Sequence, residues 1–363
     1  MINRFGQRVI RVLIVDDSLL ISNMFKAMLG DLPDIEVVGA ANNGQDAIRM
    51  ALRLHPTVIT MDIRMPQMDG LEAIRQIMGI EPIPIIVVSS NVYASDYNVA
   101  FNAIEAGALT VIEKPKGLDQ KSYETVRDQL IAAIRSLAGI TLLPRTHKMA
   151  VRPANIGPKT AMLHSYVLQS IQVIAIAAST GGPPILAQIL SALPDDFPIP
   201  ILIVQHNMPT FMTAFAEWLR TRVKIPVSVA SEGLHMQRRH IYVAPGDAHL
   251  TVTIDRVLHV DQTPHPSGFC PSANRLFQSV AASFGSSAIG IVLTGMGDDG
   301  VDGLAALAAA RAHIMVQDES SSVVFSMPKA AIDRHLADEI LSPEEMIARL
   351  TKLHQYMKSA RQM

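Results

Sequence analysis

The sequence predicts an α/β protein with two domains, each built on a parallel sheet that is covered by helices on both faces. Three observations lead to this prediction. The chain has 363 residues, which suits two domains of ordinary size. Short β-rich runs alternate with longer helical patterns in two separate regions. The strand candidates are nearly continuous apolar runs, as expected for strands buried on both faces.

The first domain is predicted at 8–137, where strand and helix patterns alternate five times. The strand candidates are the runs "VIRVLIV", "IEVVGA", "TVITM", "PIIVVSS" and "ALTVIE". Helical patterns follow them at 18–29, 43–54, 70–79, 95–106 and 119–136. Five such repeats in succession predict a parallel sheet with helices on both faces.

The second domain is predicted at 171–355 and follows an interdomain linker at 138–170. The linker contains "LPRTHKMAVRPANIGPKT", which has proline, glycine and several cations but no acidic residue. We expect this linker to let one domain rest on the other or move away. Strand candidates in the second domain are "IQVIAIA", "IPILIVQ", "PVSVA", "HIYVAP", "HLTVTI", "AIGIVLT" and "AHIMVQ", with an antiparallel hairpin expected near 240–258.

The composition excludes several classes of protein. A hydrophobic fraction of 49% and a charged fraction of 18% indicate a globular chain. The formal net charge of -2 gives no general attraction to nucleic acid, so no nucleic-acid partner is expected. The only cysteine, Cys270, cannot form an internal disulfide, which favours a cytoplasmic location. Glycine and proline interrupt every long apolar segment, so no direct membrane insertion is expected.

Acidic, hydroxyl and basic residues lie where the strands of the first domain end. Asp16 and Asp17 follow the first strand, Asp62 the third and Lys114 the fifth, and Ser89 closes the fourth. In an open parallel sheet these ends meet at one edge. Three crowded carboxylates repel one another, and a hard divalent cation usually neutralises such a cluster. The pattern therefore predicts a Mg²⁺ site formed by Asp16, Asp17 and Asp62.

This set of residues suits phosphoryl transfer to a carboxylate. Asp62 could attack phosphorus while the cation and Lys114 offset the charge on the transferring group. The hydroxyl of Ser89 could then bond a new phosphoryl oxygen and move a loop. Taken singly, an acidic pair is more often a helix cap and a lone lysine a solvated charge. The order and spacing together favour the functional interpretation.

This part of the chain resembles the response-regulator receiver domain. The resemblance rests on "VDDS" at 15–18, "MDIRMPQMDG" at 61–70, "VVSS" at 87–90 and "EKP" at 113–115. It implies a doubly wound, flavodoxin-like sheet of five strands and Mg²⁺-dependent phosphorylation of Asp62 by a histidine kinase. It also implies switch roles for Ser89 and Lys114, and a cis peptide bond before Pro115.

Three loops of the second domain carry a serine, a histidine and an acid. Ser179 lies in the turn between the apolar strand "VIAIAA" and a helical pattern, where free N–H groups can stabilise an oxyanion. Small residues after it, Thr180 and Gly181 among them, leave room for a substrate carbonyl. His206 directly follows the strand "IPILIVQ", and the loop "GMGDDG" after another buried strand offers Asp298 or Asp299 to orient it.

Other interpretations of these loops remain. "STGG" could cap a helix or hold a phosphate, although no phosphate-loop lysine and no GxGxxG pattern accompany it. Three further histidines, at positions 240, 249 and 265, are weaker candidates for the base because none clearly closes a parallel strand. A non-enzymatic effector that binds a regulator or DNA is the main rival class. The second domain shows no helix-turn-helix pattern or basic face in its favour.

The second domain resembles the catalytic domain of the chemotaxis protein-glutamate methylesterases. The resemblance rests on "AASTGG" at 177–182, "VQHNMP" at 204–209, "YVAPGDAHL" at 242–250, "PSANRLF" at 271–277 and "LTGMGDDG" at 293–300. It implies Ser179 as nucleophile, His206 as base and Asp299 as orienting acid. It places Thr180, Gly181 and Met296 near the oxyanion.

The resemblance also implies a biological role. The expected substrate is a methylated chemoreceptor with cytoplasmic helices, whose glutamate methyl esters would be hydrolysed and whose glutamines would be deamidated. The expected phosphodonor is a histidine kinase of the CheA-type, and the receiver would gate the triad. No cofactor is expected at the esterase site. Cys270 and Asn274 stand where many relatives carry Arg and Asp. The final "KSARQM" lacks the aromatic acidic peptide that docks some receptors, so that tether is not expected.

Overall fold

A computed structural model of the chain describes residues 9–89, 97–115, 120–140, 142, 171–207, 209–263 and 268–360. It divides into two compact units, Met1–Met149 and Ala150–Met363. Nearly all of the predicted linker at 138–170 lies outside the described residues. No helix among the described residues is long and apolar enough to span a membrane.

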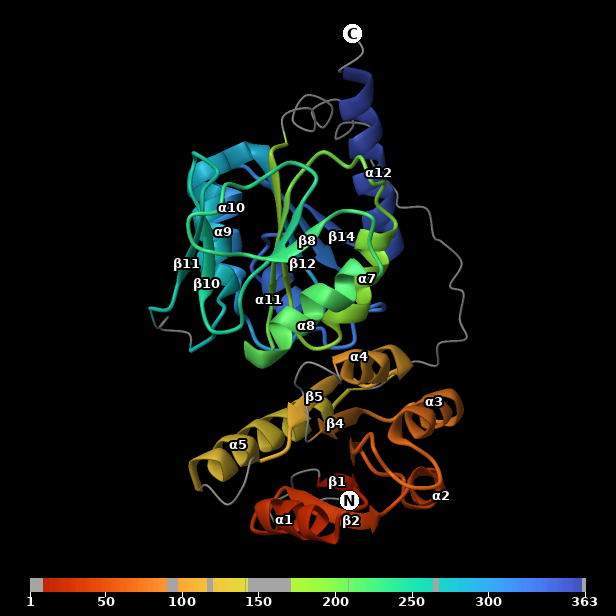
Figure 1. Cartoon of the computed structure of the whole chain (residues 1–363). Coiled ribbons are helices and arrows are strands. Elements are labelled where there is room, and N and C mark those ends of the chain that lie inside the picture. The colour runs from red at the N-terminus through yellow and green to blue at the C-terminus, as the bar shows by residue number, and fades with distance from the viewer. Residues whose placement is uncertain are drawn as a thin grey trace. The chain divides into compact units, whose positions relative to one another are not determined.

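The N-terminal unit is a five-stranded parallel sheet with helices on both faces, as predicted. Its strand order is β2-β1-β3-β4-β5, the flavodoxin-like order of a doubly wound sheet. In Figure 1, α2, α3 and α4 lie on one side of this sheet and α1 and α5 on the other. The strands are β1 (Ile10–Val15), β2 (Ile35–Ala41), β3 (Val58–Met61), β4 (Ile85–Ser89) and β5 (Thr110–Glu113). The helices are α1 (Leu19–Gly30), α2 (Gly44–Leu54), α3 (Gly70–Ile80), α4 (Tyr97–Ala106) and α5 (Gln120–Leu137).

Local sequence explains where these elements begin. The four residues of β3 and the last four of β1 are fully buried, because central parallel strands have helices on both sides. Ser18, Asn43 and Asp69 cap α1, α2 and α3, each accepting a backbone N–H of the first turn. The strand order reverses between β1 and β3, so Asp16 and Asp62 follow the two strands that border this switch point.

The C-terminal unit is built on a seven-stranded parallel sheet. Its order is β14-β13-β12-β6-β7-β9-β8. The first strand along the chain, β6, is central. The strands β7, β8 and β9 lie on one side of it, and β12, β13 and β14 lie on the other. The strands are β6 (Val173–Ala178), β7 (Ile201–Gln205), β8 (Val227–Val229), β9 (Ile241–Val243), β12 (Ala288–Val292), β13 (His313–Gln317) and β14 (Glu339–Leu341).

Helices and one hairpin cover the two faces of the seven-stranded sheet. The range 240–258 expected for an antiparallel hairpin also contains β9, which pairs in parallel with β7 and β8 in the main sheet. The antiparallel hairpin is formed by β10 (His249–Val252) and β11 (Leu258–Asp261), later in the chain than expected. It lies with α9 and α10 on one side of the sheet, and α7, α8 and α12 lie on the other (Figure 1). The helices are α7 (Gly182–Ser191), α8 (Pro209–Arg220), α9 (Ala273–Phe284), α10 (Val301–Ala309), α11 (Ser326–Asp333) and α12 (Pro343–Ala360), and a 3₁₀ turn spans Gly285–Ser287.

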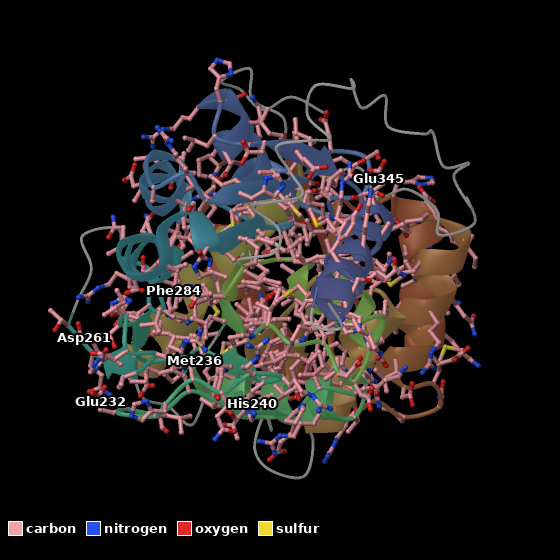
Figure 2. All side chains as sticks on the ribbon, turned by 90° about the horizontal axis from the view of Figure 1, so that it is seen from above. Glu232, Met236, His240, Asp261, Phe284 and Glu345 are labelled. Atoms are coloured by element: carbon pink, nitrogen blue, oxygen red, sulfur yellow. The ribbon has the colours of Figure 1, made fainter. Side chains whose placement is uncertain are left out.

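A continuous apolar core joins the hairpin side of the sheet to α9 and α10. It includes Val204 of β7, Phe277 and Phe284 of α9, and Met236 before β9, all buried. Glu232, on the same stretch of chain as Met236, is exposed, and Figure 2 shows it at the rim of the unit. The carboxyl ends of β6, β7 and β12 leave this rigid core side by side, which fixes where their loops begin.

Candidate active site

Ser179 and His206 follow two neighbouring strands of the seven-stranded sheet. Ala178 of β6 pairs with Gln205 of β7, so the next residue on each strand lies at the same level of the same edge. The backbone N–H of His206 donates to the carbonyl of Ala178 at 2.9 Å, which extends the strand pairing by one step. Because adjacent strands lie about 4.8 Å apart, the two residues are neighbours in space.

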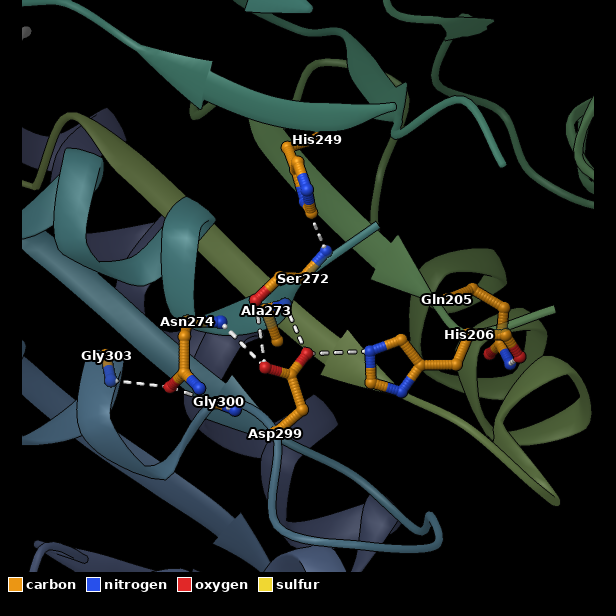
Figure 3. A network of polar contacts seen from close by, with 9 residues as sticks. All are labelled: Gln205, His206, His249, Ser272, Ala273, Asn274, Asp299, Gly300 and Gly303. Carbon is orange, nitrogen blue, oxygen red and sulfur yellow. Dashed lines mark hydrogen bonds and ion pairs between the residues drawn. The ribbon is translucent and has the colours of Figure 1, made fainter. Parts of the chain in front are cut away.

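His206 contacts an acid on a third strand end. Its Nε2 lies 2.9 Å from Oδ2 of Asp299, in the loop after β12. Asp299 is only 2% exposed, whereas Asp298 beside it is exposed. Of the two acids in this loop, the structure therefore places Asp299 next to the imidazole. Figure 3 shows the pair with its surrounding network.

The Asp299 carboxylate is held at the N-terminus of α9. Oδ1 accepts from the Ser272 hydroxyl at 2.9 Å and from the Asn274 N–H at 3.4 Å, and Oδ2 accepts from the Ala273 N–H at 2.6 Å. The free N–H groups and dipole of a helix N-terminus favour a negative charge there. Burial would raise the pKa of Asp299, but the hydrogen bond and charge of His206, with the Ala273 and Ser272 donors, outweigh it and lower that pKa. The acid is therefore anionic at neutral pH.

The other histidines considered from sequence have different surroundings. The fully buried His249 accepts the Ser272 N–H on Nδ1 at 3.0 Å (Figure 3). It therefore helps to hold Ser272, whose hydroxyl bonds Asp299. His240 bonds the Ser228 hydroxyl at 2.8 Å and stacks on a tyrosine ring. His265 lies outside the described residues. The histidine that the structure places beside Asp299 is therefore His206.

The imidazole of His206 is confined on two further sides. The ring of Phe269 stacks on it, with centroids 5.0 Å apart and an interplanar angle of 24°. Its Nδ1 is buried and has no hydrogen-bond partner among the described residues. In the serine-protease arrangement Nδ1 faces the acid and Nε2 faces the nucleophile. Here Nε2 faces the acid, so Nδ1 is the nitrogen left for a serine hydroxyl.

The turn that carries Ser179 is fixed by its backbone and leaves its hydroxyl unbonded among the described residues. The Ser179 N–H donates to the Thr294 carbonyl at 3.1 Å. The Thr294 hydroxyl in turn donates to the carbonyl of Thr180 at 3.0 Å, tying the turn to the end of β12. Gly181 has φ 78°, a left-handed conformation that glycine adopts without strain. No described residue accepts the N–H of Thr180 or Gly181.

Gly295 brings the β12 loop against the nucleophile turn. A Cβ added at Gly295 would lie 2.8 Å from Cβ of Ser179, so only glycine allows this close approach. Met296, predicted to lie near the oxyanion, follows directly and is partly exposed. Its position next to Gly295 places its backbone beside the turn.

The two departures noted in the sequence have different environments. Asn274 is buried, and its Oδ1 accepts the N–H of Gly300 at 3.1 Å and of Gly303 at 2.8 Å, which caps the start of α10 (Figure 3). It therefore links the start of α9 to the start of α10, with its side chain below the surface. Cys270 is exposed, and the partial desolvation of its sulfur together with the charge of Asp247 raises the pKa of its thiol.

The predicted acidic pocket of the N-terminal unit is present at its sheet edge. Lys114 Nζ lies 2.6 Å from Asp16 Oδ2 and 2.8 Å from Asp62 Oδ2, and all three side chains are buried. Burial raises the pKa of Asp16, and the Asp62 charge adds to this against the opposing effect of Lys114. Burial would lower the pKa of Lys114, but its bonds to Asp16 and Asp62 raise it, so the ammonium stays charged.

The acidic residues of this pocket fit a divalent cation. Asp16, Asp17 and Asp62 offer oxygens that all lie within 4.8 Å of one another, and Asp17 is exposed to solvent. One lysine does not balance three carboxylates, and the pKa of Asp16 is raised mainly by burial, with a smaller contribution from the Asp62 charge. A hard cation with oxygen ligands would relieve the excess of negative charge.

Neighbouring backbone completes this pocket. The carbonyl of Ser89 accepts the Lys114 N–H at 2.8 Å, which places this predicted switch residue beside the lysine. A Cβ at Gly70 would lie 2.0 Å from the Asp62 carbonyl, so α3 can start against the loop that carries Asp62 only with glycine. The expected cis peptide before Pro115 is wrong, because the one cis bond among the described residues is Cys270–Pro271.

Sequence reasoning missed the residues that hold these groups. Ser272 and the backbone of Ala273 bind Asp299 from 27 and 26 positions away, and Thr294 bonds the turn 114 positions before it. The run "PSAN" before a helical pattern was a detectable signal for a helix start. Nothing in the sequence indicated that this helix start would face the loop containing Asp299.

The fold and the two strand-edge sites define a response regulator: a receiver domain joined to an α/β domain with a hydrolase-like Ser, His and Asp arrangement. The response regulator receiver domain model matches 12–122, and the CheB methylesterase model matches 174–350. The chain belongs to the family of protein-glutamate methylesterase/protein-glutamine glutaminase proteins.

Two relatives illustrate this membership, and one solved structure is similar to part of the chain. A protein-glutamate methylesterase/protein-glutamine glutaminase of Geobacter metallireducens is 39% identical over 95% of this chain and 99% of its own. One of Myxococcus xanthus is 38% identical over 94% of this chain and 96% of its own. The crystal structure of the Thermotoga maritima CheB methylesterase catalytic domain is 31% identical and covers 50% of this chain and 98% of its own, with a TM-score of 0.49.

Proposed function

We propose that this protein hydrolyses glutamate methyl esters on chemoreceptors through Ser179, His206 and Asp299, and that phosphorylation of Asp62 activates it. The observation that carries the proposal is the 2.9 Å contact between His206 and the buried, anionic Asp299, beside a serine on the adjacent strand end. Family membership supports the ester substrate, since the curated relatives are named for it.

The proton path follows from which nitrogen faces the acid. Asp299 accepts the Nε2 proton of His206, which leaves Nδ1 as the base. Nδ1 takes the proton of the Ser179 hydroxyl while Oγ attacks the ester carbonyl. Asp299 stabilises the imidazolium, which then protonates the departing methanol. Water activated by the same nitrogen hydrolyses the acyl-enzyme and releases the glutamate carboxylate.

The nucleophile turn supplies donors for the tetrahedral intermediate. The N–H groups of Thr180 and Gly181 stand at the start of α7 without acceptors among the described residues, so they are available to a developing oxyanion. The backbone beside Met296 lines the same turn. Glutamine side chains fit the same sequence of steps with ammonia as the leaving group, which accounts for a glutaminase activity.

The receiver acts as the proposed switch. Asp62 accepts the phosphoryl group from a histidine kinase of the CheA-type. Asp16, Asp17 and Asp62 would hold Mg²⁺, which supplies charge neutralisation for the transfer. Lys114 and the Ser89 hydroxyl would bond the new phosphoryl oxygens, as in an electrostatic switch. The contact of Lys114 with Asp62 and the backbone bond between Ser89 and Lys114 support this. In the unphosphorylated protein the receiver covers the triad, and phosphorylation moves it away.

Methanol release from a methylated receptor tests the esterase. Wild-type protein, Ser179→Ala and Asp62→Asn are each assayed with and without a small-molecule phosphodonor. We expect no release above background with Ser179→Ala, and stimulation by the donor in wild type but not in Asp62→Asn. Equal rates in wild type and Ser179→Ala would reject the triad.

Removal of residues 1–140 tests the gate separately. We expect the shortened protein to release methanol faster than the unphosphorylated full chain, because nothing covers the triad. An unchanged or lower rate would show that the receiver does not inhibit the site.

A further inference from the structure

Gln205 joins the nucleophile loop to the base loop. It is the last residue of β7, is 1% exposed, and directly precedes His206 (Figure 3). Its Nε2 donates to the carbonyl of Ser179 at 2.9 Å and to the carbonyl of His206 at 3.1 Å. One side-chain amide therefore binds the main chains of both residues that must approach each other in the reaction.

The bond to the Ser179 carbonyl fixes the orientation of the Ser179–Thr180 peptide, whose N–H can serve the oxyanion. The Ser179 carbonyl also accepts the N–H of Gly182 at 2.9 Å, so two donors hold its oxygen. In a trans peptide the C=O and the following N–H lie in the same plane and point in opposite directions. The N–H of Thr180 is thereby turned away from Gln205, and no described residue accepts it.

The amide group of Gln205 has only one workable orientation. Reversing it would set its oxygen against two carbonyl oxygens, which repel it. Its Oε1 packs against Gly182, where an added Cβ would lie only 2.4 Å away. That oxygen is buried and has no hydrogen-bond partner among the described residues. An apolar side chain would fill this space without burying an unbonded oxygen, so the two donated bonds are what distinguishes glutamine here.

We propose that Gln205 is a positioning residue of the hydrolytic reaction. It holds the Ser179–Thr180 peptide so that the Thr180 N–H faces the oxyanion, and it holds the main chain of His206 so that Nδ1 faces the serine hydroxyl. This inference rests on the proposed function. It assigns to Gln205 an effect on the transition state and none on receptor binding, because the side chain is buried beneath the turn.

Steady-state methanol release by full-length, donor-activated protein tests this role. Gln205→Met keeps the length of the side chain and removes both donors, and Gln205→Glu keeps its shape. We expect kcat to fall roughly 10- to 100-fold in both, less than loss of a direct oxyanion donor, with KM unchanged. The rate at which a fluorophosphonate labels Ser179 should fall in parallel, because that small probe needs the same turn but no receptor.

A second carboxamide on α7 provides the matched control. Gln188 is exposed, and its Nε2 donates to Glu344 at 2.8 Å, away from the turn. Gln188→Met should keep the wild-type kcat. Rates are divided by the folded fraction from urea denaturation, so partial unfolding cannot imitate the effect.

The outcomes separate this inference from the proposed function. Wild-type kcat in both Gln205 variants, or a raised KM with unchanged kcat, would overturn the positioning role even if Ser179→Ala is inactive. An active Ser179→Ala would overturn the proposed function itself.

Discussion

Replacing Asp299 by asparagine removes one charge and little else. The carboxylate receives four donors, with His206 and Ala273 on Oδ2 and Ser272 and Asn274 on Oδ1. An asparagine oxygen can take the place of Oδ2 and keep the first two. Its NH₂ then faces the Ser272 hydroxyl, which can rotate and accept, and only the long 3.4 Å bond from the Asn274 N–H is lost. The His206 ring therefore keeps its position while the imidazolium loses its counter-charge.

The size of the effect follows from the separation of the charges. Imidazolium and carboxylate centres about 4 Å apart attract by roughly 4 kcal/mol at an effective dielectric constant near 20. Only the charged imidazolium of the transition state benefits, so this energy adds to the barrier. With about 1.4 kcal/mol per tenfold change in rate, Asp299→Asn should lower kcat roughly 10³-fold and leave KM unchanged.

The assay is methanol release under donor-activated conditions, with Asp298→Asn as the control. Asp298 carries the same group one residue earlier but is exposed, so its replacement should leave kcat at the wild-type value. A decrease of less than about tenfold in Asp299→Asn, or equal decreases in the two variants, would refute the account of the acid.

Three other predictions follow from the same contacts. Ser272→Ala removes the 2.9 Å bond to Asp299, and kcat should fall roughly tenfold, as for a hydrogen bond to a charged group; a wild-type kcat would contradict this. Because the pKa of Asp299 is lowered on folding, its carboxylate stabilises the fold above its ordinary pKa of 3.8, and this contribution is lost as pH falls through the lowered value. Unfolding free energy measured at decreasing pH should therefore fall more steeply in wild type than in Asp299→Asn, and parallel curves would exclude the linkage. Lys114→Ala leaves Asp16 and Asp62 buried without their cation, and urea denaturation should show a loss of about 3 kcal/mol that Mg²⁺ partly restores; a loss indifferent to Mg²⁺ would argue against the metal site.

Most of the fold was predictable because buried parallel strands have an obvious pattern. The runs that became β1, β6 and β12 are apolar at nearly every position, and only burial on both faces explains that. The strand β14 was missed. It has three residues, Glu339–Leu341, and exposes Ile340, so neither length nor pattern marks it as an edge strand.

The site was predictable to the extent that strand ends determine it. Ser179, His206 and the acidic loop each follow a strand, and parallel strands bring such ends to one edge. The strand pattern alone left Asp298 and Asp299 as alternatives, and only the resemblance indicated Asp299. The structure supplies the physical reason, which is that the Asp299 side chain points at the start of α9. The role of Gln205 was also out of reach, since a buried glutamine closing an apolar strand reads as an ordinary strand residue.

Covalent labelling of the nucleophile tests the central claim most directly. The activated protein is incubated with a fluorophosphonate, and mass spectrometry locates the adduct while methanol release is followed in the same samples. The account predicts one adduct per chain on Ser179, with activity lost in proportion to labelling and no adduct in Ser179→Ala. Complete labelling of Ser179 with methanol release intact would contradict it.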